Sequence, residues 1–306
     1  MKRFLFLLGR RLKTLEYWLT AKLVIGVLAL LRRLPPEKAL NLADRVARTF
    51  GPKVGRHRLA VDNLRQAYPE KSDAEFETIA RDMWGNMARL AVEYVFLDKL
   101  FDFDPEAETP GRVEVEGVEI FKRLREEKGV PHIFFTGHMG NFEFLPIAAA
   151  RFDLTTTSLF RPPNNPFVAD YILETRRSAM GGLVPSQAGA ALQLARVLDD
   201  GGNIGVLVDQ KFRKGVKTRF FGRECRTNPL LAKLARQYEC DVYPARCKRL
   251  PGGRYRLIVE DKVALPRNAD GVIDIEASAQ MLNDVVERWV REDPGQWMWF
   301  HKRWQM

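Results

Sequence analysis

The chain has 306 residues, 46% of them hydrophobic and 29% charged, which is ordinary for a globular protein with a substantial core. The net charge of +10 is unusual and indicates an acidic partner, such as nucleic acid, anionic lipid or an acidic carrier protein. No nucleic-acid-binding signature is present, which excludes that class, so we expect a membrane-lipid or lipid-phosphate partner; a basic surface without a partner is the alternative. Neither a C-x-x-C pair nor a dense His/Cys cluster suggests a metal site.

Residues 1–36 are predicted to anchor the chain to a membrane. An apolar stretch from Leu23 to Leu31 is flanked by the basic pairs Arg10-Arg11 and Arg32-Arg33. The unbroken apolar run is shorter than the ~20 residues of an ordinary spanning helix, while Tyr17 and Trp18 suit a membrane interface. We therefore expect an anchoring helix, spanning or interfacial, rather than a cleaved signal peptide. A buried amphipathic helix is the alternative.

Residues 37–110 are predicted to form a helical region. Apolar residues recur at three- and four-residue spacing from Lys38 to Phe50 and from Ser72 to Lys99. Ser72 is suited to cap the second of these helices. A linker rich in Asp, Glu and Pro follows, from Asp102 to Pro110.

Residues 111–306 are predicted to form an α/β domain with a mixed, mostly parallel central sheet flanked by helices. Strand-like and helix-like segments alternate, which is typical of a parallel sheet covered on both faces. The turn residues Pro251 to Gly253 indicate a hairpin, which makes the sheet mixed. Strands are expected at 113–116, 130–136, 154–160, 204–208, 241–249 and 255–260, and helices at 118–127, 144–151, 171–179, 187–198, 229–238 and 275–291.

The most informative stretch runs from Ile133 to Phe144, where a strand-like apolar run is followed by G-H-M-G-N-F-E. On one continuous helix, His138 and Glu143 would lie roughly 140° apart. They can meet only if the chain turns between them, and Gly137 and Gly140 supply that freedom. The sequence therefore predicts a strand, a tight turn carrying His138, and a helix with Glu143 in its first turn.

His138 and Glu143 suggest acid–base chemistry. A neutral imidazole, with an ordinary pKa of about 6.5, can accept a proton near neutrality. A carboxylate on the other ring nitrogen would orient it and stabilise the imidazolium. Because the motif contains neither Ser nor Cys, the hydroxyl to be activated is expected to belong to the substrate, which favours direct acyl transfer. A core histidine bonded to a backbone carbonyl is the alternative.

Two further predicted strands end in polar residues. Arg161 follows the strand at 154–160, and Asp209-Gln210 follow the strand at 204–208. Sites in such sheets gather at the carboxyl ends of strands, so these residues and His138 are expected at one edge. Arg161 is suited to hold a phosphate or carboxylate, or alternatively to bond turn carbonyls. Asp209 is suited to bind an acceptor or a cation, or to pair with an arginine.

Several segments carry a family resemblance. G-H-M-G-N-F-E resembles the H-x-x-x-x-[D/E] block of the glycerolipid and lipid A acyltransferase superfamily. Other segments resemble specifically the bacterial lipid A late acyltransferases, the lauroyl/myristoyl acyltransferases, and occur in that family's order from about residue 60 to the C-terminus. They are Asn63-Leu64 with Tyr68-Pro69-Glu70, Phe160 to Pro166, Val208-Asp209-Gln210 with Gly215 and Phe220-Phe221-Gly222, and Pro294 to Arg303.

The resemblance implies transfer of a fatty acyl chain from acyl carrier protein to a hydroxyl of a 3-hydroxyacyl chain on a Kdo-bearing lipid A precursor. Such enzymes act at the cytoplasmic face of the inner membrane of Gram-negative bacteria, and neither organic cofactor nor metal is implied. The catalytic residues would be His138 and Glu143, and the substrate-binding residues Arg161, Asp209, Asn141 and Gln210. An acyltransferase for another glycolipid or glycerophospholipid acceptor, and a non-enzymatic basic membrane-surface protein, are the rival interpretations.

Overall fold

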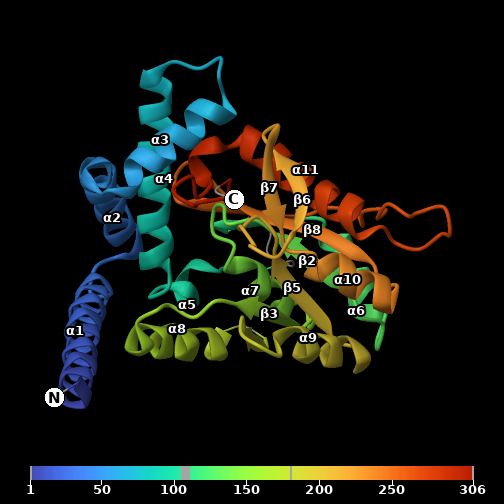
Figure 1. Ribbon diagram of the computed structural model, residues 1–306, viewed down its shortest axis with the longest axis horizontal. Helices are drawn as coiled ribbons and strands as arrows, with labels where there is room; N and C mark the ends of the chain where they lie inside the picture. Colours follow the sequence, from blue (N-terminus) through green and yellow to red (C-terminus); the bar gives the residue numbers. More distant parts are fainter. Residues whose placement is uncertain (1, 105–110, 180, 305–306) are drawn as a thin grey trace.

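The computed structural model describes residues 2–104, 111–179 and 181–304, without the side chains of residues 2–8 and 175–179. Within this part of the chain, a seven-stranded sheet has the order β1-β9-β8-β2-β5-β3-β4, and β6 and β7 form a separate hairpin (Figure 1). The strands are β1 Val113–Glu116, β2 Ile133–Thr136, β3 Thr156–Phe160, β4 Leu183–Pro185, β5 Asn203–Leu207, β6 Val216–Phe220, β7 Arg223–Thr227, β8 Val242–Leu250 and β9 Arg254–Val259.

The central sheet is mixed and mostly parallel, as predicted. β2 pairs in parallel with β5 and β8, β3 pairs in parallel with β5 and β4, and β1 pairs in parallel with β9. The exception is the antiparallel β8–β9 pair, whose turn contains Gly252 and Gly253 at φ values of +76° and +71°. These left-handed conformations favour glycine and explain the hairpin signal.

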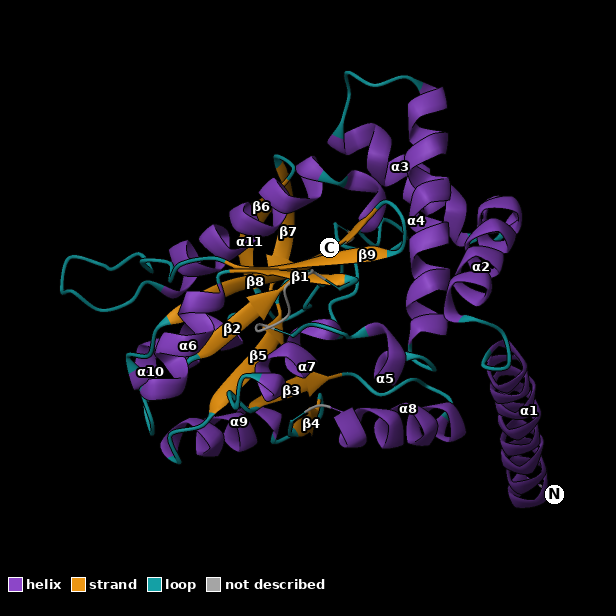
Figure 2. Ribbon diagram, turned by 180° about the vertical axis from the view of Figure 1, so that it is seen from behind, coloured by secondary structure: helices purple, strands orange, loops and turns teal. Residues whose placement is uncertain are grey.

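Helices cover both faces of the sheet (Figure 2). In β2, Ile133 and Phe135 belong to a core with α9, α10 and α11, while Phe134 belongs to a core with α6 and α7. Successive strand residues point to opposite faces, so an apolar run such as Ile133 to Phe135 is expected in a strand covered on both faces. The helices of this part are α6 Val118–Glu126, α7 Phe144–Arg151, α8 Pro166–Ala179, α9 Ala190–Asp199, α10 Leu230–Tyr238 and α11 Ile275–Glu292.

The N-terminal third is helical, as expected, and packs directly on the sheet domain. Ser72 caps α4 through a reciprocal capping box with Glu75. α4 packs against α2 on one side and against the 3-10 turn η2, Pro294–Gln296, on another. Residues 105–110 of the expected linker lie outside the described residues. The elements here are α1 Lys2–Leu31, α2 Pro36–Phe50, η1 Gly51–Lys53, α3 Arg56–Ala67, α4 Asp73–Glu93 and α5 Leu97–Leu100.

The helix α1 extends from the body of the molecule (Figure 1). Its stretch Gly9–Leu31, 23 residues, is long and apolar enough to cross a membrane. Only 6% of the most apolar part of this stretch is buried. That exposure contradicts the alternative of a buried core helix. The mid-helix carbonyl of Tyr17 accepts a hydrogen bond of 2.7 Å from Asn165 Nδ2 at the start of α8. α1 is therefore a candidate membrane anchor that is tied to the sheet domain.

Candidate active site

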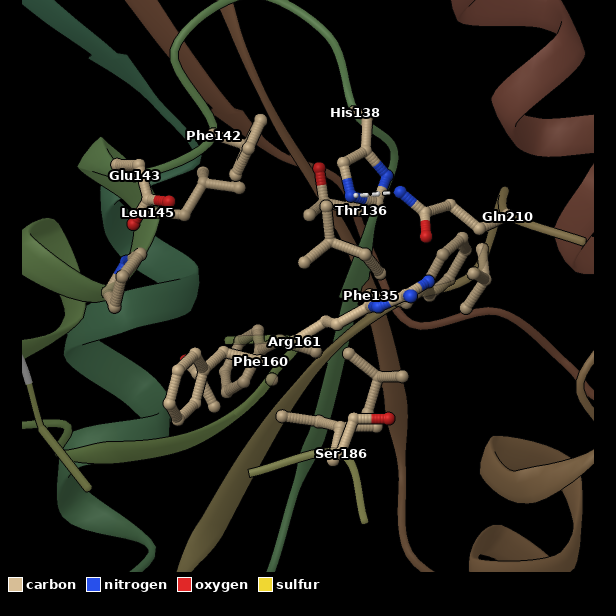
Figure 3. A pocket seen from close by; sticks show the side chains of 18 of the residues that line it. Phe135, Thr136, His138, Phe142, Glu143, Leu145, Phe160, Arg161, Ser186 and Gln210 are labelled. Atoms are coloured by element: carbon tan, nitrogen blue, oxygen red, sulfur yellow. Dashed lines mark hydrogen bonds between the residues drawn. The ribbon is translucent and has the colours of Figure 1, made fainter. Parts of the chain in front are cut away.

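Three strand ends bring the predicted site residues to one edge of the sheet. His138 follows β2, Arg161 follows β3, and Asp209 and Gln210 follow β5, which lies between the other two strands. The side chains of His138, Arg161 and Gln210 line one pocket of about 650 Å³ (Figure 3). The position agrees with the general location of sites in parallel sheets.

Asp209 holds the imidazole of His138. The aspartate is 2% exposed and accepts three hydrogen bonds of 2.7 Å each. The His138 backbone N–H and the Trp297 indole N–H donate to Oδ2, and His138 Nδ1 donates to Oδ1. Since a carboxylate can only accept, the ring proton belongs on Nδ1. The lone pair of Nε2 is then available as a base.

The surroundings of Asp209 keep its carboxylate ionised. Burial on its own would raise the pKa of Asp209, but the electrostatic attraction of His138 and the hydrogen bonds from His138 and Trp297 outweigh burial and hold the pKa well below its ordinary value. The negative charge of the Asp209 carboxylate beside Nδ1 stabilises the imidazolium that forms when Nε2 takes a proton. The pair is therefore suited to general-base chemistry.

Gln210 contacts the other side of the same ring. Its Nε2 lies 2.9 Å from His138 Nε2, and with the ring proton on Nδ1 the amide is the donor (Figure 3). The Phe142 ring packs edge-on against the imidazole at 5.3 Å between centroids. These contacts leave 18% of the His138 side chain exposed. The imidazole is thus held from three sides and open toward the pocket.

The partner of His138 corrects the sequence prediction, because Asp209 and not Glu143 bonds to Nδ1. Glu143 is the N-cap residue of α7 and is 4% exposed. Its carboxylate accepts a hydrogen bond from the Tyr94 hydroxyl. In Figure 3 it lies across the pocket from His138, beyond Phe142. The chain does turn between the two residues, but the turn carries His138 toward the end of β5.

Asn141 is also placed differently from the prediction. It is fully buried, does not line the pocket, and donates from Nδ2 to Glu93 Oε2 at 2.9 Å. Its Oδ1 accepts the Glu143 N–H at 3.1 Å. Glu93 in turn pairs with Arg249 and accepts a hydrogen bond of 2.7 Å from Tyr255. Asn141 therefore ties the turn after β2 to a buried polar network rather than facing a substrate in this pocket.

Gly140 allows the turn to pack against the C-terminal segment. Its φ is +55°, and a Cβ would lie 1.8 Å from the Cys247 carbonyl oxygen. Its N–H donates to the Gln296 carbonyl at 3.1 Å, and the neighbouring Met139 forms a β-bridge with Trp297. Only glycine fits this conformation and this approach. The close packing brings the Trp297 indole to Asp209.

The sequence reasoning did not assign Trp297 and His301 to the site. Trp297, which donates to Asp209, belongs to the C-terminal block that carries the family resemblance. His301, from the same block, lines the pocket, and burial lowers the pKa of His301 to about 4, so it is neutral at neutral pH. That block was the available signal for both residues.

The pocket is apolar inside and basic at its rim. Its apolar lining includes Phe121, Phe134 and Ala149. The rim residues Arg161 and Lys211 form neither hydrogen bonds nor ion pairs within the described part of the chain. Among those residues there is also no group of three His, Cys, Asp or Glu side chains that could hold a metal ion. The arrangement suits an apolar chain whose reactive end lies beside a base and an anion-binding rim.

Comparison with known proteins gives a consistent result. The family model for the bacterial lipid A biosynthesis acyltransferases matches residues 8–306. The lipid A biosynthesis myristoyltransferase of Escherichia coli K12 is 26% identical over 298 residues, which cover 94% of this chain and 87% of the relative. Lipid A biosynthesis acyltransferase 1 of Shigella flexneri is 25% identical with the same coverage. Acyltransferase 2 of that organism is 29% identical over 56% of this chain and 52% of its own length. The chain belongs to the bacterial lipid A biosynthesis acyltransferase family.

Proposed function

We propose that the protein transfers a fatty acyl chain from an acyl carrier protein thioester to the hydroxyl of a 3-hydroxyacyl chain on a Kdo-lipid A precursor. The reaction takes place at the cytoplasmic face of the inner membrane of a Gram-negative bacterium. Family membership supports lipid A acylation. The observation that carries the proposal is the His138–Asp209 pair at the mouth of an apolar pocket.

In the proposed reaction His138 is the general base. Nε2 takes the proton of the acceptor hydroxyl as its oxygen attacks the thioester carbonyl carbon, and Asp209 stabilises the imidazolium. The tetrahedral intermediate collapses with loss of the carrier thiolate, to which the imidazolium returns the proton. A C–O bond forms and a C–S bond breaks, so no other reactant is needed. A positioned base of this kind contributes roughly 10²- to 10⁴-fold to the rate.

Direct transfer fits the surroundings of His138 better than an acyl-enzyme route. A covalent route needs a nucleophile within hydrogen-bond reach of the base. Among the described residues, no Ser, Thr or Cys side chain hydrogen-bonds to His138; its ring partners are Asp209 and Gln210. The hydroxyl therefore comes from the acceptor, which supports a substrate that carries one.

Gln210 and Arg161 have separate roles in this proposal. The acceptor hydroxyl must displace the Gln210 amide from Nε2, since both use the same lone pair. The freed amide then lies beside the reacting atoms, where it can donate to the developing oxyanion. Arg161, which has no partner in the described structure, binds an acidic group of a substrate at the rim. Glu143 lines the same pocket and completes its polar wall.

A basic segment beside the pocket supports an acidic donor. Lys211 lines the pocket, and the exposed Arg213, Lys214 and Lys217 follow it; none of the four forms an ion pair with a described residue. Unpaired cations of this density attract an acidic carrier protein and increase the rate of encounter. Removal of these charges should raise the KM for the carrier-bound donor without changing kcat.

Two measurements test donor and acceptor separately. Mass spectrometry of lipid A from a strain that lacks the protein should reveal species with one acyl chain fewer, and an unchanged pattern would favour another glycolipid or a glycerophospholipid as acceptor. With purified protein, the carrier-bound donor should react faster than the same acyl group on coenzyme A. Equal rates would remove the carrier from the proposal but leave the acceptor in place.

A further inference from the structure

The outward face of α2 and the turn after it carry an apolar stripe. Leu42, Val46 and Phe50 are spaced four residues apart, and Val54 continues the series. Their exposed fractions lie between 48% and 55%, although each is a large apolar residue. The opposite face of α2, with the buried Ala39 and Leu40, packs against α4. The stripe is therefore a face of α2 that the described residues leave uncovered.

Cations, and no acidic residues, share this face. The exposed residues between positions 38 and 58 are Lys38, Asn41, Leu42, Arg45, Val46, Thr49, Phe50, Lys53, Val54, Gly55, Arg56 and Arg58. None of the five cations forms an ion pair with a described residue. The two acidic residues of α2, Glu37 and Asp44, are partly buried and pair with arginines. The face thus combines apolar side chains with a uniform positive charge.

α1, which precedes the stripe in the chain, also has an exposed apolar face. That face comprises Leu12, Leu15, Leu19, Leu23, Val27 and Leu30, and Leu34 lies in the turn before α2. In Figure 1 and Figure 2, α1 and α2 lie on the same flank of the molecule, away from the sheet. An apolar stripe with cations beside it is typical of a helix that lies in the plane of an anionic membrane surface.

We propose that α2, with the turn to Arg58, is a second membrane-contact element that lies flat on an anionic bilayer beside α1. A single anchoring helix leaves the body free to rotate about its axis. A second contact fixes that rotation and with it the direction of the pocket. The segment Phe160–Pro166, which contributes residues to the pocket rim, is joined to α1 by the Asn165–Tyr17 hydrogen bond. The position of the rim relative to the membrane is therefore fixed. This inference does not depend on the proposed acyl transfer.

A local probe tests the contact in the full chain, whether or not α1 alone binds vesicles. An environment-sensitive fluorophore is attached at Val46→Cys in a Cys240→Ser background, since Cys225 and Cys247 are buried. The matched control is Leu192→Cys, a residue of α9 that is 59% exposed. The helix α9 lies across the molecule from α2 (Figure 1). With phosphatidylglycerol-rich vesicles, the emission at position 46 should shift to the blue and be quenched by lipids brominated on their acyl chains. Position 192 should show neither effect.

Two results would overturn the proposal. One is a probe at position 46 that stays as water-exposed as the probe at position 192 while the protein floats with the vesicles. The other is a response at position 46 to added acidic carrier protein but not to vesicles, which would make the face a protein-docking surface.

A triple variant supplies an independent measurement. Leu42→Ser, Val46→Ser and Phe50→Ser change only exposed side chains, so the melting temperature should stay near that of the wild type. If the acyl transfer proposed above holds, transfer to an acceptor embedded in vesicles should fall by about tenfold or more, since three apolar contacts with the bilayer are lost. Transfer to the same acceptor dispersed in detergent should change by less than about twofold. An equal fall in both assays would contradict the membrane contact and indicate another role of α2. If the wild type itself showed no turnover, the proposed acyl transfer would be contradicted, and the fluorescence test of the membrane contact would still stand.

Discussion

Replacing Asp209 with asparagine tests whether the carboxylate of Asp209 sets the protonation of the His138 ring. Asp209 Oδ2 accepts two donors at 2.7 Å, the His138 backbone N–H and the Trp297 indole, and Oδ1 accepts His138 Nδ1 at 2.7 Å. Asparagine has the same shape but one carbonyl oxygen and one NH₂ group. Because two donors meet Oδ2, the carbonyl oxygen takes that place and the NH₂ group faces Nδ1.

The substitution then inverts the ring tautomer. Nδ1 must accept from the NH₂ group, the proton moves to Nε2, and the base toward the pocket is lost. The same change in a serine-protease triad lowers kcat by about 10⁴, so we expect a loss of roughly 10³- to 10⁴-fold, or about 4 to 5.5 kcal/mol of transition-state stabilisation. KM should change little, since Asp209 does not line the pocket.

The assay measures steady-state acyl transfer by purified wild type, Asp209→Asn and Glu143→Gln, with circular dichroism and thermal unfolding to verify the fold. Glu143→Gln is the matched control, because Glu143 lies in the same pocket but does not bond to the imidazole ring. The reasoning would be refuted if Asp209→Asn kept more than about a tenth of the wild-type kcat while Glu143→Gln lost about 10³-fold.

Three further predictions concern stability and specificity. Gly140→Ala should destabilise the fold by more than about 2 kcal/mol in denaturant unfolding, because its Cβ would lie 1.8 Å from the Cys247 carbonyl; an unchanged midpoint would contradict the packing. His301 has a folded pKa of about 4 against 6.5 unfolded, so the unfolded state binds the extra proton between these values and stability falls as pH falls from 6.5 to 4. His301→Asn should remove up to about 3 kcal/mol of that loss, measured by unfolding at both pH values. Gly205→Val should shift the transferred chain toward shorter acyl groups in product mass spectra, since position 205 lines the pocket and a Cβ there meets only Ser158 Oγ at 3.4 Å.

The overall architecture could be predicted because its signals are local. Apolar runs ended by glycine, proline or polar residues indicated β2, β3 and β5, and the Pro251–Gly253 turn indicated the mixed sheet. The β6–β7 hairpin was not predicted. Its residues Lys217 to Phe220 alternate between exposed cations and buried Thr218 and Phe220, and a segment with this many charges is as typical of an exposed loop as of a strand. In a strand of five residues, two exposed cations leave too few apolar positions for the alternation of buried and exposed side chains to be recognised in the sequence.

The partner of His138 could not be predicted from spacing. Asp209 lies 71 residues from His138, and the two meet only because β5 inserts between β2 and β3 in the sheet. Strand order is a property of the whole fold, whereas the five-residue spacing to Glu143 is visible in the sequence and suggested a local partner. The expectation that strand ends gather at one edge was correct, and it placed Asp209 close to His138 without specifying their contact.

The domain division at residues 36 and 110 stays a prediction. Both hydrophobic cores contain residues from the helical region and from the sheet domain, such as Leu64 with Ile133 and Leu100 with Phe134. The sequence marks the change from helical to alternating patterns, but composition alone does not reveal that the two regions share their cores. This shared packing also places Glu93 of α4 against the turn that carries His138.

The most direct test of the central claim is an acyl-transfer assay on wild type and His138→Ala, with acyl carrier proteins that bear different chains and a Kdo-lipid A precursor. Mass spectrometry reads the product, and thermal unfolding verifies that the variant is folded. We predict that the precursor gains the mass of one acyl chain with the wild type and that the gain is lost, by roughly 10³-fold or more, with His138→Ala. An undiminished gain with the folded variant would contradict the role of His138 as the base.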